Sequence, residues 1–248
     1  MKYNGNKKNR GFTLVETVIA MGIITIMITA FLAAFGPAAQ GIRKSISAKE
    51  ANRLASTLES ELSILRVDEA APTGDFSTAF EKAYEWIEGS GSNTKENMVL
   101  LYQYRGDPNS IRADGTPEPF TGTDGVAGVD YIVQTVVRRF DDTDELTAEL
   151  APRVVEGRVF FVRMTQLIFD NGELVLAGED GAAGGAGRIV DPNAPDEDTN
   201  FENYPDAVIA FQAQFYALES SLYQYAAGPF DPNDPGKPVF TRNMAVRR

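Results

Sequence analysis

A long apolar segment near the N-terminus limits the folds open to this chain more than any other feature. From Phe12 to Gly41 the only charged residue is Glu16. As a helix with a rise of about 1.5 Å per residue, the roughly 25 uncharged residues after Glu16 would reach about 38 Å. The hydrocarbon core of a bilayer needs only about 20 residues. The segment therefore predicts a helix that can span a membrane, in preference to the core helix of a soluble domain.

The composition of the chain excludes several kinds of site. Its 248 residues include neither cysteine nor histidine. It can therefore form no disulfide, no Ser-His-Asp triad and no zinc site built from Cys or His. The net charge is −12, which disfavours nucleic acid as a partner because phosphate has the same sign.

Glu16 is the unusual residue of the apolar segment. A carboxylate near the end of a membrane span costs a few kcal/mol unless it is paired or lies near the interface. The segment before it is basic, with Lys2, Lys7, Lys8 and Arg10 and no acid. Two other interpretations stay open from these residues alone. One is an ordinary signal peptide cut near Ala39, and the other is an uncleaved anchor, which leaves Glu16 unexplained.

The run Arg10-Gly11-Phe12-Thr13-Leu14-Val15-Glu16 resembles the leader motif of type IV prepilins and pseudopilins. That motif has a basic residue, Gly, an aromatic or apolar residue, Thr, two aliphatic residues and Glu. The resemblance implies that a prepilin peptidase cleaves after Gly11 and that the new N-terminal residue, Phe12, is N-methylated. It also implies that Glu16 pairs with the N-terminal amine of a neighbouring subunit during assembly.

The physics of such a pairing is reasonable. A free N-terminal amine with a pKa near 8 is largely cationic at neutral pH. An isolated charge is costly in hydrocarbon, both for this amine and for the Glu16 carboxylate. Their pairing would therefore fix the register of stacked helices. The resemblance further implies a single-pass protein of the cell inner membrane with its leader in the cytoplasm. The expected partners are other pilin or pseudopilin subunits, the prepilin peptidase and an inner-membrane assembly platform.

The patterning beyond the span divides the chain into four parts. We expect a leader at 1–11, a transmembrane and assembly helix at 12–41, an amphipathic stalk helix at 42–66 and a globular domain at 67–248. Gly36-Pro37 predicts a break or kink near the end of the span. Beyond it, apolar residues recur at helical spacing and predict a helix laid on a domain: Ala51, Leu54, Ala55, Leu58, Leu62 and Leu65.

The globular part is predicted to be α+β, with an antiparallel sheet packed on the long helix. A short helix is expected at Asp75 to Glu88. Strands are expected at Met98 to Tyr104, Tyr131 to Phe140 and Val208 to Leu218. The turn Asp170-Asn171-Gly172 between two alternating segments predicts a hairpin of Arg158 to Phe169 with Glu173 to Leu176. We expect Arg138-Arg139 to form a solvated strand end.

Three stretches read as loops: Gly178 to Gly187, Asp191 to Asp206 and Phe230 to Pro238. Two of them carry oxygen ligands that calcium accepts. No other cofactor is expected, and neither stretch matches an EF-hand. A solvated acidic loop is the favoured interpretation of both stretches. The candidate calcium ligands are Asp191, Asp196, Asp198, Asp231, Asn233 and Asp234.

The sequence therefore predicts a non-enzymatic, structural subunit of a type IV pilus-like or type II secretion filament, in the periplasm or at the cell surface. Removal of an 11-residue leader from 248 residues leaves 237. This length favours a minor subunit, such as a J-type pseudopilin. The alternative is a membrane-anchored extracytoplasmic protein that uses a pilin-like leader to display a ligand-binding domain.

Overall fold

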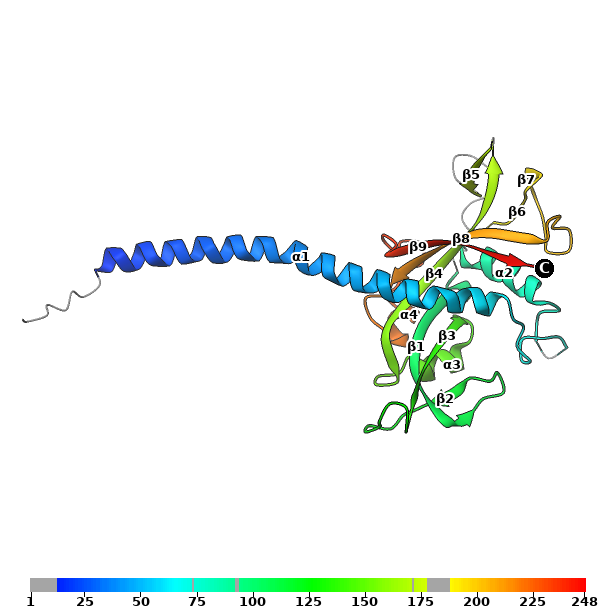
Figure 1. The fold of residues 1–248 in the computed structure, drawn as a ribbon, viewed down its shortest axis with the longest axis horizontal. Helices are drawn as coiled ribbons and strands as arrows, with labels where there is room; N and C mark the ends of the chain where they lie inside the picture. Colours follow the sequence, from blue (N-terminus) through cyan, green and yellow to red (C-terminus); the bar gives the residue numbers. More distant parts are fainter. Residues whose placement is uncertain (1–12, 73, 92–93, 171, 178–187) are drawn as a thin grey trace, which may run out of the picture. The chain divides into compact units, whose positions relative to one another are not determined.

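The computed structural model describes residues 13–72, 74–91, 94–170, 172–177 and 188–248. Figure 1 shows one long helix, α1 (Leu14–Leu62), followed by a domain of strands and short helices. The described chain falls into two compact units, which meet between Ile46 and Ser47, within α1. The predicted boundary at residue 42 also lies within α1, so no change of secondary structure marks it.

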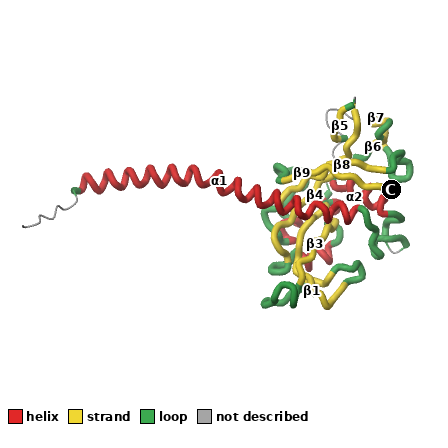
Figure 2. Tube along the Cα trace, in the orientation of Figure 1, coloured by secondary structure: helices red, strands yellow, loops and turns green. Residues whose placement is uncertain are grey.

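The second unit is built around an antiparallel sheet. Figure 2 shows its strands in yellow and its helices in red. The shorter helices are α2 (Ala79–Ser90), η1 (Lys95–Asn97), α3 (Thr143–Glu149) and α4 (Tyr223–Ala227). The strands are β1 (Val99–Ile111), β2 (Pro117–Pro119), β3 (Ile132–Arg139), β4 (Val155–Asp170), β5 (Glu173–Leu176), β6 (Val190–Asp191), β7 (Ala194–Asp198), β8 (Val208–Ala217) and β9 (Phe240–Arg247).

The main sheet has seven strands, and each of its pairings is antiparallel. Its path is β2-β1-β4-β8-β9, while β3 also pairs with β1 and β5 pairs with β4. The predicted hairpin is confirmed, since Phe169 lies opposite Leu174 and Asp170 opposite Glu173. Its central turn residue, Asn171, lies outside the described residues. The α+β class and the long N-terminal helix are likewise confirmed.

Both faces of the central strands are buried, because alternate residues of a strand point to opposite sides. On one face, Val99 and Leu101 of β1 join a core with Leu54 and Leu58 of α1 and with residues of α2. On the other face, residues of β1, β4 and β8 join a second core with α3 and α4: Leu100, Tyr102, Phe161, Tyr216, Leu146, Leu150 and Ala226. The second unit is therefore a sheet with helices on both faces.

The C-terminal part of α1 is held on the sheet by polar as well as apolar contacts. Ala51, Leu54, Ala55, Leu58 and Leu62 are buried, which confirms the predicted amphipathic helix. Glu50 reaches the start of β4, where its Oε1 accepts a hydrogen bond of 3.3 Å from Arg158 N. Gly157 permits this approach, since its φ is +69° and a Cβ there would lie 2.4 Å from Glu50 Oε1.

Several local predictions differ from the structure. The helical backbone of α1 continues through Gly36 and Pro37, so the helix does not break there, while the alternative of a kink stays a prediction. Proline removes one intrahelical hydrogen bond, a loss that the intact turns on either side can tolerate. The stretch Asp191 to Asp206 is not all loop, because β6 and β7 form a small hairpin there. The predicted loop 178–187 lies outside the described residues.

The structure contradicts the prediction made for Arg138. We expected a solvated strand end, but only 6% of Arg138 is exposed. Its guanidinium lies 2.8 Å from Asp114 Oδ2 and 3.0 Å from Glu149 Oε1. Both carboxylates come from segments that the strand pattern does not place near β3. The sequence pattern of β3 therefore could not reveal that this arginine is buried and paired.

Candidate assembly site and a cavity beside helix α2

The first turn of α1 holds the residue that the leader motif singles out. Thr13 N donates to Glu16 Oε2 at 2.9 Å, and the Thr13 hydroxyl donates to the same oxygen at 3.0 Å. In return, Glu16 N donates to Thr13 Oγ1 at 3.2 Å. This is a capping box, in which the residue before a helix and the third helical residue satisfy each other's free backbone N–H groups.

The capping box gives Glu16 a role in the single chain that we did not predict. The signal is nevertheless present in the sequence, as Thr13-Leu14-Val15-Glu16 has the Thr-x-x-Glu spacing of such a box. A helix that begins at Leu14 places Glu16 near its positive end, where a carboxylate is favoured. Gly11 and Phe12, the predicted cleavage and methylation residues, lie outside the described residues.

The rest of the N-terminal half of α1 is apolar and uncovered. The mean hydropathy of its most apolar 18 residues is 2.5, and none of them is buried in the single chain. Large side chains such as Ile26 and Met27 are about two-thirds exposed, at 71% and 66%. The hydroxyls of Thr25 and Thr29 donate to helix carbonyls four residues earlier, each at 2.8 Å, so they need no outside partner in lipid.

An exposed helix that is apolar on all sides indicates a membrane span. Within the described residues, the N-terminal half of the helix is long and apolar enough to anchor the chain in a membrane, and it carries its single carboxylate in the first turn. The family model described as "Prokaryotic N-terminal methylation motif" matches residues 6–32, which include Gly11, Phe12 and Glu16. The chain thus carries a type IV prepilin leader. No curated protein and no solved structure matched the chain.

The match supports general statements about the processing, the anchoring and the role of the protein. A leader of this type implies processing by a prepilin peptidase and assembly with other pilin-like subunits. Together with the apolar helix, it indicates anchoring in a membrane. It also favours a structural protein over an enzyme.

The residues predicted to bind calcium do not form one cluster in the described chain. Asp191 Oδ1 accepts a hydrogen bond from Asn193 N at 2.8 Å, and Asp231 Oδ1 accepts one from Asn233 N at 2.9 Å, so both carboxylates stabilise local turns. The side chains of Asp196 and Asp198 lie outside the described residues. Among the residues described, no group of three or more acidic side chains could hold a metal ion. Calcium binding remains a prediction.

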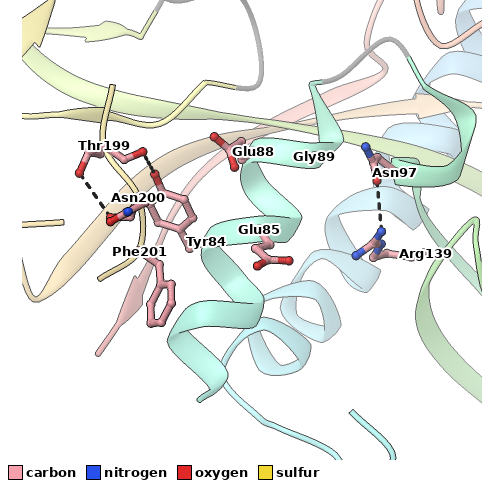
Figure 3. A pocket seen from close by; sticks show the side chains of 9 residues that line it. All are labelled: Tyr84, Glu85, Glu88, Gly89, Asn97, Arg139, Thr199, Asn200 and Phe201. Carbon is pink, nitrogen blue, oxygen red and sulfur yellow. Dashed lines mark hydrogen bonds between the residues drawn. The ribbon is translucent and has the colours of Figure 1, made fainter. Parts of the chain in front are cut away.

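The second unit contains a cavity of about 510 Å³ beside α2, which we call the α2 cavity (Figure 3). Such a volume is typical of ligand sites, which range over roughly 300–1,000 Å³. Figure 3 shows residues of α2 with the 199–201 segment on one side and residues of η1 and β3 on the other. Its lining consists of Tyr84, Glu85, Glu88, Gly89, Asn97, Arg139, Thr199, Asn200 and Phe201.

Hydrogen bonds fix the walls of the α2 cavity. The Tyr84 hydroxyl donates to Thr199 O at 2.8 Å, which joins α2 to the segment that follows β7. On the opposite wall, Arg139 Nη2 donates to Asn97 Oδ1 at 3.1 Å. Sequence reasoning missed this cavity because its walls come from segments up to about 115 residues apart along the chain.

Proposed function

We propose that this protein is a structural, non-enzymatic subunit of a type IV pilus-like or type II secretion filament, and a minor pilin or pseudopilin. The prepilin peptidase removes the leader after Gly11, Phe12 becomes the methylated N-terminus, and α1 assembles with the helices of other subunits. One observation carries this proposal: the membrane-spanning part of α1 is uncovered on every side, and Glu16 in its first turn is its only charged residue.

The geometry supports a role for Glu16 in docking. Cleavage after Gly11 would leave the new amine of Phe12 directly before Thr13, close to the first turn of α1. The amine of a neighbouring subunit would find the Glu16 carboxylate already oriented by the Thr13 N–H and hydroxyl. An ion pair with this amine would compensate both charges in hydrocarbon and would fix the axial position of one helix against the next.

The size of the second unit supports a minor role. Ser47 to Arg248 forms one compact unit with two cores and helices on both faces of its sheet. A subunit with such a large extracytoplasmic domain fits the initiating or upper part of a filament better than a repeated shaft. Before assembly the chain would be a single-pass protein of the inner membrane, and afterwards part of a filament in the periplasm or at the cell surface.

Glu16→Gln is the sharpest test of the assembly role. Glutamine also serves in a capping box, so this change removes the charge and keeps an acceptor for Thr13 N. Glu16→Leu removes both. We expect both variants to insert in the membrane and to be cleaved, but to be depleted at least about tenfold from sheared filaments relative to the membrane pool.

Thr25→Val is a matched control inside the same helix. Among the described residues, the Thr25 hydroxyl bonds to Met21 O of the same helix, so the variant should assemble like the wild type. If Glu16→Gln and Glu16→Leu also assembled like the wild type, the proposed amine–carboxylate pairing would be wrong. If Glu16→Leu alone failed, the capping hydrogen bonds and not the charge of Glu16 would be required.

A second candidate function rests on the α2 cavity. A membrane-anchored protein that displays a ligand-binding domain would need a site of this kind, away from its anchor. This function predicts a chain that works from the membrane without entering a filament. The fraction of wild-type protein in sheared filaments separates the two candidates.

A further inference from the structure

Strand β9 forms one outer edge of the main sheet (Figure 1). Within the described chain it pairs with β8 alone, over eight residue pairs without a shift of register. Just beyond this ladder, Arg248 N donates to Ala207 O at 2.8 Å, in the same register. Hydrogen-bonded pairs alternate with non-bonded pairs in an antiparallel ladder. Even-numbered residues of β9 therefore bond to β8, and the odd-numbered ones direct their backbone N–H and C=O groups away from the sheet: Thr241, Asn243, Ala245 and Arg247.

The outward edge of β9 is uncovered in the part of the chain that the structure describes. All four of these odd-numbered residues are exposed. Among the described residues, no hydrogen bond involves their backbone N–H or C=O groups. An exposed strand with such a row of free backbone groups is a template on which another extended segment can add.

The other outer strands of the main sheet are shorter or partly closed. β2 and β5 have only three and four residues, and short edge strands limit unwanted pairing. β3 has eight residues, but Gln134 Nε2 donates to Thr135 O at 3.0 Å and so occupies a carbonyl on its outward side. β9 has eight residues and contains no proline. It is therefore the outer strand best suited to accept a further strand.

The charge at this edge indicates the chemistry of the partner. β8 and β9 contain no acidic residue, although the net charge of the chain is −12. Arg247 is exposed and forms no ion pair among the described residues, whereas Arg242 lies 3.4 Å from Glu59 and keeps 38% of its side chain exposed. The two arginines point to opposite faces of the sheet, because one is odd-numbered and the other even-numbered. Charge complementarity therefore favours an acidic segment and disfavours a second β9.

We propose that the outward edge of β9 binds an extended, acidic segment of a partner polypeptide, which adds to the main sheet as a further strand. The backbones of Thr241, Asn243 and Ala245 would exchange hydrogen bonds with this segment. Arg242 and Arg247 would attract its carboxylates, one on each face of the sheet. The backbone bonds would supply affinity, and the arginines would select an acidic sequence. The proposal concerns the second unit alone and does not rest on the proposed filament function.

The binding test uses the full chain in a neutral detergent and the fluorescence anisotropy of peptides that carry an uncharged dye. The first probe is Thr-Glu-Val-Glu-Val-Glu-Thr-amide, and its basic partner has Lys in place of each Glu. A third peptide keeps the acids but has methylated backbone nitrogens at its central Glu and the Val before it, so neither of its edges can form a full ladder. We expect saturable binding of the first peptide, weakened by salt, and about tenfold weaker binding of the other two.

Ala245→Pro is the diagnostic variant, because proline removes an outward N–H that β8 does not use, and edge strands tolerate proline at such a position. It should weaken binding of the acidic peptide by about tenfold. Arg247→Gln leaves the backbone intact, and it should weaken this binding by about threefold and reduce its dependence on salt. Lys49→Gln removes an exposed cation of α1, so it should bind like the wild type. Far-ultraviolet circular dichroism shows whether each variant is folded.

Several results would overturn the proposal. Equal binding of the methylated peptide would show attraction between charges without strand pairing, and equal binding of the basic peptide would exclude selection of acids. Unchanged affinity in Arg247→Gln and in folded Ala245→Pro would place the binding elsewhere. Dimerisation of the wild type that Ala245→Pro abolishes, without binding of the peptide, would assign the edge to a second copy of the chain. The test involves neither cleavage nor Glu16, so its failure would leave the proposed filament function untouched.

Discussion

Arg138 and Glu149 form a buried ion pair, with Arg138 Nη2 at 3.0 Å from Glu149 Oε1. The Glu149 side chain has no exposed surface, and it also accepts hydrogen bonds from Arg112 and from the Tyr102 hydroxyl. Through these contacts one carboxylate at the end of α3 joins Tyr102 of β1, Arg138 of β3 and Arg112 of the turn between β1 and β2. Such a group costs much to desolvate and depends on every partner being present.

Glu149→Ala should therefore destabilise the domain strongly. The change would leave the largely buried Arg112 and Arg138 without their shared carboxylate, at a cost of about 3–5 kcal/mol. Glu118→Ala is the matched control, because Glu118 pairs with Arg112 at 3.1 Å but is about half exposed. Its loss should cost about 0–1 kcal/mol. Thermal unfolding followed by the fluorescence of Trp86, the single tryptophan, measures both. Equal effects would contradict the assigned network.

Asp142 should make stability depend on pH. Burial is the main cause that raises the pKa of its carboxyl from 3.8 to about 6; Asp141 and Glu145 also raise this pKa, whereas Arg138 and Arg139 lower it. Because the folded state holds this proton more tightly, the protonated carboxyl favours folding below about pH 4. That contribution is lost as the pH rises through about 6.

Asp142→Asn should accordingly raise the unfolding temperature at pH 7 and have little effect near pH 4. We expect a gain of about 1–2 kcal/mol at neutral pH, reduced for the solvent that still reaches this half-buried group. Asp124→Asn, in an exposed loop, should change the unfolding temperature little at either pH. A gain for Asp142→Asn that was the same at both pH values would contradict the raised pKa.

A fragment from Ile42 to Arg248 should be soluble, folded and cooperative in unfolding. It keeps every buried residue of α1, from Ser47 to Leu62, and omits the exposed apolar span. A fragment from Ser63 would lose Leu54 and Leu58 and uncover the face of the sheet that they cover, so it should aggregate. Size-exclusion chromatography compares the two. Aggregation of the longer fragment would show that the domain boundary is misplaced.

Processing should produce a mature chain that begins at Phe12. Its formal charge should fall from −12 to −16, because four basic residues and no acid leave with the leader. Gly11→Val should block cleavage, since a branched side chain replaces the residue that lets the leader adopt an extended, pliable form. Intact-mass measurement of membrane extracts checks both outcomes. A start near Gln40 would instead identify an ordinary signal peptide.

Elements with strong local patterns were predictable from the sequence. The apolar run of α1, its buried positions from Ala51 to Leu62, and the hairpin of β4 with β5 all follow from spacing and turn residues. The leader motif was equally local, and the family match at residues 6–32 covers it. The capping box of Thr13 and Glu16 was also predictable, because the Thr-x-x-Glu pattern lies within four consecutive residues.

Other features were decided only by tertiary structure. In the segment Phe240–Arg247, Arg242 interrupts the alternation of Phe240, Met244 and Val246, and β9 pairs with β8 over a ladder of eight residue pairs. The burial of Arg138 depends on carboxylates from a loop after β1 and from the end of α3. The α2 cavity likewise needs residues from four separate segments. Local spacing determines which residues share a face of one element, but only packing between elements determines which charges meet and where a hollow remains.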